Sequence, residues 1–205
     1  MKAIITSFLM IVCFSGFSQE ELKLKGVTME NDHHKGISWV KSKEVRLNKD
    51  GVWSGSSSDC NMQLYFGIKE IDGKAFLTPI KLQSLFWGDE WVFFDEISFL
   101  FGTPKEIRDW KGTKFTLETS GKRSVGNGIS EESTVNIEGE SKNLIKYILE
   151  NEPTNLNVRF ANTDRNEYVE FDVSKKTVEK LQKHFKALVD SYNRVSKFYT
   201  LNQSF

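Results

Sequence analysis

The sequence predicts an α+β fold, in which a mainly antiparallel β-sheet packs against a long C-terminal helix and one shorter helix. Two observations predict it. Alternating apolar and polar residues dominate the first two thirds of the chain, whereas apolar residues at steps of three and four dominate its end. Strands followed by a terminal helix suit an antiparallel sheet that is covered on one face. The alternative is a β-sandwich with a terminal helix.

The clearest predicted strand covers residues 62–71, because Met62, Leu64, Phe66 and Ile68 point to one side and the residues between them to the other. Asp72-Gly73 follows it and predicts a tight hairpin, because such turns need positive φ angles. Residues 74–82 resume the apolar character, although Pro79 restricts part of this strand to an edge or a bulge.

Shorter alternating patterns predict the other strands, and we expect them over residues 37–47, 91–101, 113–119, 134–137, 155–161 and 168–173. The last two form a second hairpin. Residues 120–133 are polar and rich in glycine and serine, so we expect a long surface loop there.

Two helices are predicted, each after a serine that can cap it. Ser141 precedes a short apolar stripe that ends near Leu149. Ser174 precedes the longest predicted helix, residues 175–199, whose apolar stripe comprises Val178, Leu181, Phe185, Leu188, Tyr192, Val195 and Tyr199.

The start of the chain has the order of a secretory signal peptide: Lys2, a short apolar run, then small residues up to Ser18. We expect residues 1–18 to be cleaved off before Gln19, or one residue later. The apolar run is too short to span a membrane, and Cys13 lacks the preceding small residue that lipidation requires. A short signal followed directly by a glutamine is typical of bacterial sequences. The expected location is the periplasm, the cell surface or the medium.

After cleavage, we expect residues 19–36 to be a loose lead-in and residues 37–205 to be a single α+β domain. Without Lys2, the mature chain has one more acidic than basic residue, which gives no indication of a nucleic-acid partner. No further apolar run reaches membrane-span length. Cys60 is the only cysteine left, so no internal disulfide can form. It is either a buried apolar side chain or a reactive thiol.

The candidate ligand-binding residues are Trp87, Asp89, Trp91 and Asp95. Two tryptophans beside carboxylates are typical of sugar contacts, although most aromatic residues belong to a core. Asp95 is expected on an apolar strand face, where a carboxylate must be paired, protonated or exposed. It is therefore a candidate ligand contact or catalytic acid, or else a structural ion pair.

No catalytic motif, metal site or cofactor is predicted, because the histidines are few and no nucleophile motif occurs. We therefore expect an exported, non-enzymatic binding or structural protein whose partner is a protein or a small ligand. The alternative is a carboxylate-based hydrolase or a carbohydrate-binding module that acts on an extracellular polymer. Convergence of Asp89, Glu90, Asp95 and Glu96 with tryptophans in a concave pocket would favour the alternative.

Overall fold

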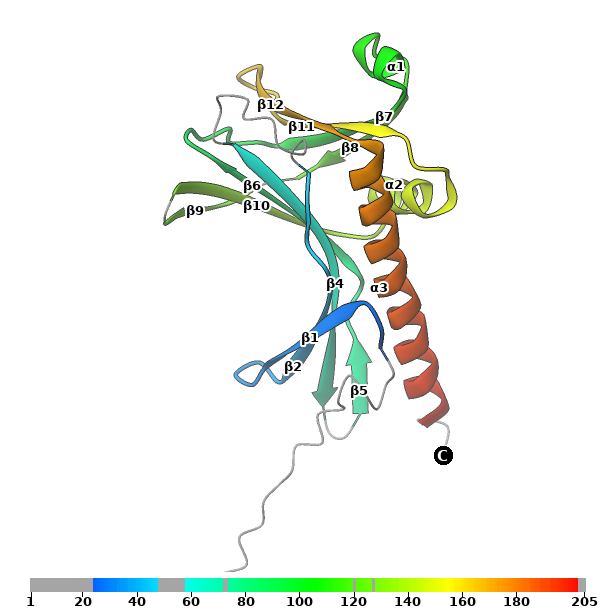
Figure 1. Ribbon diagram of the computed structural model, residues 1–205. Helices are drawn as coiled ribbons and strands as arrows, with labels where there is room; N and C mark the ends of the chain where they lie inside the picture. The colour runs from blue at the N-terminus through cyan, green and yellow to red at the C-terminus, as the bar shows by residue number, and fades with distance from the viewer. Residues whose placement is uncertain (1–23, 48–57, 72–73, 120, 127, 203–205) are drawn as a thin grey trace, which may run out of the picture.

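The computed structural model describes residues 24–47, 58–71, 74–119, 121–126 and 128–202. In this part of the chain, two antiparallel sheets pack with three helices, and the predicted α+β class is confirmed (Figure 1). The predicted signal peptide and the Asp72-Gly73 turn lie outside the described residues.

The larger sheet has eight strands with β4 near its centre. Its order is β1-β2-β4-β6-β10-β9, and the short strands β3 and β5 also pair with β4. The strands are β1 (Val27–Asp32), β2 (Ile37–Ser42), β3 (Val45–Arg46), β4 (Asp59–Ile71), β5 (Lys74–Leu77), β6 (Lys81–Gly88), β9 (Lys122–Gly126) and β10 (Gly128–Asn136). Pro79 lies in the gap between β5 and β6, where it disturbs no strand pairing.

The smaller sheet has the order β12-β11-β7-β8. Its strands are β7 (Glu96–Gly102), β8 (Thr113–Glu118), β11 (Asn155–Asn162) and β12 (Glu167–Val173). The predicted hairpin of β11 and β12 is confirmed, with Val158 opposite Phe171. The two central strands, β7 and β11, carry most of the buried side chains.

Three helices accompany the sheets: α1 (Pro104–Arg108), α2 (Gly139–Glu150) and α3 (Lys175–Asn202). The apolar stripe of α3 is buried as predicted, and its first turn is capped at Ser174, whose Oγ accepts from the Thr177 N–H at 3.3 Å. Helix α1 was not predicted from the sequence; it begins with a Thr103–Glu106 capping box. Helix α2 starts two residues before the predicted cap Ser141, which lies in its first turn.

The core has two halves that differ in what covers the large sheet. In the helix-covered half, α3 lies along β1, β2, β3 and β4 (Figure 1). There the Phe66 ring on β4 lies 5.1 Å from that of Tyr192. In the two-sheet half, β6 faces the smaller sheet, and the Phe86 ring lies 5.9 Å from that of Phe160. Buried residues from both halves form one continuous cluster.

Two segments expected to be irregular are strands. The prediction of a loop over residues 120–133 is wrong, because β9 and β10 form a hairpin there with Ile129 opposite Val125. Antiparallel backbone bonds form without apolar side chains, so the polar composition misled the prediction. Likewise, residues 27–32 of the predicted lead-in form β1 and pair with β2.

Two predicted strands are divided or shortened. Residues 37–47 form β2 and β3 with a break between them. The predicted strand 91–101 begins only at Glu96, because Phe93 adopts a left-handed φ of 54°. The buried side therefore switches from Val92 and Phe94 to Ile97, and the expected continuous apolar face does not exist.

Candidate functional site

The four predicted ligand-binding residues have different surroundings. Asp95 precedes β7, and its carboxylate accepts from the Thr163 N–H at 3.0 Å and from the Thr163 hydroxyl at 2.8 Å. The Trp91 ring packs 5.8 Å from that of Phe93. Trp87 lies on the large sheet with 37% of its surface exposed, and Asp89 is exposed in the bend after it. The expectation that Asp95 lies on an apolar strand face is wrong, since it holds the turn that follows β11.

A buried carboxylate that the sequence pattern did not indicate holds the segment before β7. Glu131 on β10 is fully buried, and its Oε1 accepts from the N–H groups of Val92 at 2.7 Å and Phe93 at 2.9 Å. Its Oε2 has no hydrogen-bond partner among the described residues, and the Arg123 Nε lies 3.9 Å away. Hydropathy gave no sign of this role, because the position falls in a polar stretch.

Two arginines complete this cluster. The guanidinium carbons of Arg123 and Arg165 lie 4.6 and 5.1 Å from the centre of the Phe93 ring. The Asn162 Nδ2 donates to the Phe93 carbonyl at 2.9 Å. A non-glycine residue in the left-handed conformation destabilises the fold by about 1–3 kcal/mol. These contacts offset that cost at Phe93, so a structural role explains the cluster without a ligand.

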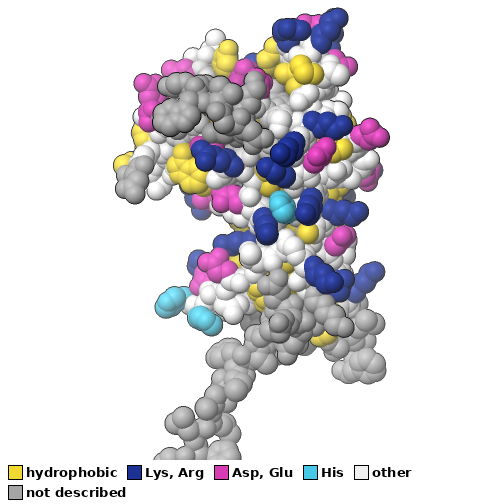
Figure 2. All heavy atoms as spheres, viewed as in Figure 1, with side chains coloured by type: hydrophobic (Ala, Val, Ile, Leu, Met, Phe, Trp, Pro, Cys, Tyr) yellow, Lys and Arg dark blue, Asp and Glu magenta, His cyan; other side chains and the backbone are white. Residues whose placement is uncertain are grey.

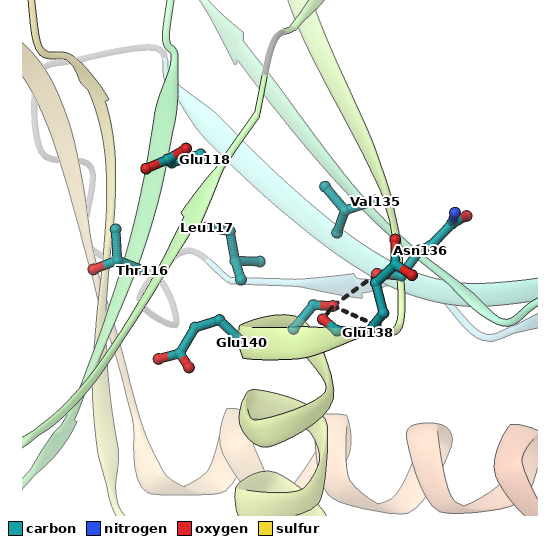
Figure 3. Close-up of a pocket in the computed structure, with 8 residues that line it drawn as sticks. Thr116, Leu117, Glu118, Val135, Asn136, Glu138 and Glu140 are labelled. Carbon is teal, nitrogen blue, oxygen red and sulfur yellow. Dashed lines mark hydrogen bonds between the residues drawn. The ribbon is translucent and has the colours of Figure 1, made fainter.

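A pocket of about 500 Å3 opens between β8, β10 and the start of α2. Figure 3 shows Leu117 and Val135 in its interior, while the carboxylates around it belong to Glu118, Glu138 and Glu140. All three glutamates are exposed. The attraction of exposed carboxylates for a cation is largely screened by salt, so this pocket offers little binding energy. None of the four predicted ligand-binding residues lines it.

The surroundings of the histidines and of Cys60 do not favour metal binding or thiol reactivity. His33 and His34 lie in the turn between β1 and β2. Within the described ranges, no three His, Cys, Asp or Glu side chains are grouped so that they could hold a metal ion. Burial, with a smaller effect of the Asp59 charge, raises the pKa of the Cys60 thiol well above its usual value. Cys60 is therefore a buried apolar side chain with little thiolate at neutral pH.

The most extensive candidate site is the outer face of the large sheet, on the side of β4 away from α3. By the strand register the following side chains share this side, and we call them the open face: Trp39, Asn61, Gln63, Tyr65, Gln83 and Trp87. Their pairing partners Lys41, Asp59, Lys81 and Leu85 lie on the same side. In Figure 1, the β1–β2 and β9–β10 hairpins both project on this side. Figure 2 shows the outline of the molecule hollowed between the two projections.

Aromatic rings stand at both ends of the open face, with amide side chains between them. Trp39 and Tyr65 meet edge to face at 5.5 Å, and Trp87 lies opposite Asp59 at the other end. The intervening six residues of β4 span about 20 Å at ~3.3 Å per residue. Between the ends, the Gln63 Nε2 donates to the Gln83 Oε1.

One amide on the open face is incompletely bonded. The Asn61 Nδ2 donates to the Glu44 Oε1 at 2.7 Å, whereas its buried Oδ1 has no partner among the described residues. A buried acceptor without a donor costs free energy. The sequence identified Trp87 of this face, but the neighbours of Trp87 come from strand pairing.

None of the helices in the described part of the chain is long and apolar enough to cross a membrane. A comparison with protein families, curated proteins and solved structures found no significant match to this chain in any of the three.

Proposed function

We propose that this chain is an exported, non-enzymatic binding protein whose open face holds an extended, neutral carbohydrate chain. The observation that carries the proposal is the pair of aromatic groups at the ends of a row of amide side chains, on a sheet face that none of the helices in the described residues covers (Figure 1). Export rests on the signal-peptide pattern at the start of the sequence.

Sugar chains fit the chemistry of this face. Aromatic rings pack against the apolar side of a sugar ring, and amides donate to and accept from hydroxyl groups. The face has both, in the rings of Trp39, Tyr65 and Trp87 and in the amides of Gln63 and Gln83. A span of about 20 Å between the rings suits several consecutive sugars rather than one small molecule.

Binding without hydrolysis is favoured by the dispersal of the carboxylates. A glycosidase needs two carboxyl groups that flank the bond it cleaves. Asp95 is occupied by Thr163, and the pairing partner of Trp87 on the open face, Asp59, forms an ion pair with Arg46. Glu30, which lies opposite Trp39, is likewise paired with Lys41, so among the described residues neither carboxylate directly opposite a tryptophan of the open face is free.

The test is calorimetric titration of the mature chain with neutral hexasaccharides of β-linked glucose, β-linked N-acetylglucosamine and α-linked glucose. We expect one of these series to bind. Trp87→Ala and Tyr65→Ala each remove one stacking surface and should weaken binding about fivefold to tenfold.

Tyr168→Ala is the matched control, because Tyr168 is an exposed ring on β12 of the other sheet. It should bind sugar as the unaltered chain does. Absence of binding to all three sugars would contradict the proposal, as would equal affinities for the Trp87, Tyr65 and Tyr168 variants.

A further inference from the structure

Helix α3 differs in charge from the rest of the chain. It carries seven lysine or arginine residues and only two acidic residues, Glu179 and Asp190, whereas the whole chain has 28 residues of each sign. The remainder of the chain therefore has an acidic excess. Figure 2 shows dark blue basic side chains gathered along this helix. The neutral total hides a strong separation of charge.

Five of these cations form one row on the solvent side of the helix, which we call the α3 stripe: Lys176, Lys180, Lys183, Arg194 and Lys197. Successive members are three, four or eleven residues apart, steps that return to the same side of an α-helix. All five are exposed. The opposite side of the helix is packed in the core through Leu181, Phe185 and Leu188, so the row is held on a fixed backbone.

None of the stripe's cations forms an ion pair in the part of the chain that the structure describes, although Glu179 and Asp190 lie four residues before Lys183 and Arg194 on the same side of the helix. The six ion pairs found there all lie outside α3. Positive charge is dense enough to affect a neighbour: burial, then the charges of Lys43 and Lys183, lowers the pKa of His184. An anionic partner would relieve this repulsion.

We propose that the α3 stripe binds a linear polyanion, a polymer with sulfate, phosphate or carboxylate groups repeated along its length. Cations three or four residues apart on a helix face lie about 5–6 Å from one another, so the stripe comprises a group of three (Lys176, Lys180, Lys183) and a group of two (Arg194, Lys197). The two groups are separated by eleven residues, roughly 17 Å along a straight helix of roughly 40 Å. A row of point charges on a rod suits a single extended polymer chain.

Two other partners fit this surface less well. A membrane-bound helix inserts an apolar face into the bilayer, but the apolar face of α3 lies in the protein core. A protein interface has an apolar, aromatic centre, and none of the large exposed hydrophobic side chains in the described residues belongs to α3. The stripe and the open face are on opposite sides of β4, so this inference does not rest on the proposed function.

The experiment measures binding of the mature chain to dextran sulfate at low and moderate salt, with uncharged dextran, polyglutamate and phosphatidylglycerol vesicles in parallel. The dextran sulfate affinity should fall at least tenfold between 50 and 200 mM salt, because about four or five contacts release counterions. The triple variant Lys176→Glu/Lys180→Glu/Lys183→Glu should lose at least tenfold in affinity.

Lys105→Glu/Lys111→Glu/Lys114→Glu is the matched control, since it changes the net charge equally at exposed sites away from α3. It should lose less than threefold, and Lys176→Arg/Lys180→Arg/Lys183→Arg should bind normally. Equal losses in the two glutamate variants, no binding to dextran sulfate or polyglutamate, or tighter binding to the vesicles would overturn the inference. Thermal unfolding of each variant checks the fold.

Discussion

The helix-covered half and the two-sheet half of this protein bury apolar residues by different means. In the helix-covered half, one long amphipathic helix presents a stripe of mostly aliphatic side chains to β4. In the two-sheet half, phenylalanine rings from different strands meet, with Phe160 at 5.1 Å from Phe94, 5.9 Å from Phe86 and 6.0 Å from Phe171. Helical spacing alone aligns the first set, whereas the second requires several strands to be in register.

The two halves also differ in how they treat buried polar groups. The helix-covered half has Ser191 of α3 buried with its hydroxyl donating to the Ala187 carbonyl at 2.7 Å. The two-sheet half buries the charged side chain of Glu131 to hold the N–H groups of Val92 and Phe93. The two-sheet half, whose backbone is irregular before β7, thus depends on a carboxylate, and burying a carboxylate costs more free energy than burying a hydroxyl.

The largest expected effect tests whether the phenylalanine cluster is the more sensitive core. Phe160→Ala should lower the free energy of unfolding by about 3–5 kcal/mol, because it removes a fully buried ring and three ring contacts. Phe66→Ala in the helix-covered half should cost about 0.5–1.5 kcal/mol less, since Phe66 has one ring contact, with Tyr192. Urea unfolding measures both, and a larger loss for Phe66→Ala would reverse the comparison.

An intermediate effect is expected at Glu131. Glu131→Ala leaves two backbone N–H groups without their acceptor and should lower the free energy of unfolding by about 2–4 kcal/mol. Glu131→Gln keeps an acceptor oxygen near Val92 and Phe93 and should cost under about 1.5 kcal/mol. Urea unfolding of both variants measures the two losses in the free energy of unfolding. Identical values for the two variants would show that the acceptor role is not what stabilises the segment.

The smallest effect is a pH dependence in the helix-covered half. Burial, followed by Lys43 and Lys183, lowers the pKa of His184 in the folded chain. The unfolded chain therefore binds the proton more readily, and stability falls as pH drops from about 6.5 through the folded pKa. His184→Gln should lose less stability than the unaltered chain between about pH 7 and pH 5. Urea midpoints at both pH values check this, and parallel pH profiles would contradict it.

The net charge of the whole chain does not show how its charged residues are distributed. The balanced composition gave no reason to expect an anionic partner, and a chain-wide sum cannot reveal which cations are paired. In the structure, Arg46 and Arg159 have acidic partners, Asp59 and Glu170, while the α3 stripe has none in the described ranges. The pairs depend on strand neighbours distant in sequence, whereas the stripe follows from helical spacing.

The sequence by itself determined the elements whose pattern is local. The apolar stripe of α3, the alternation of β4 and the hairpin of β11 and β12 each needed only neighbouring residues, and the α+β class followed from their order. The Asp95 prediction failed, because the left-handed φ at Phe93 interrupts the extended backbone before β7 begins, so the alternation assumed from residue 91 onward does not continue through Asp95.

Tertiary structure alone decided the β9–β10 hairpin, the burial of Glu131 and the grouping of Trp39, Tyr65 and Trp87 on one face. Each depends on which strands become neighbours and in which register. A shift of one residue would move every side chain of a strand to the other face, and partners far apart along the chain fix that choice.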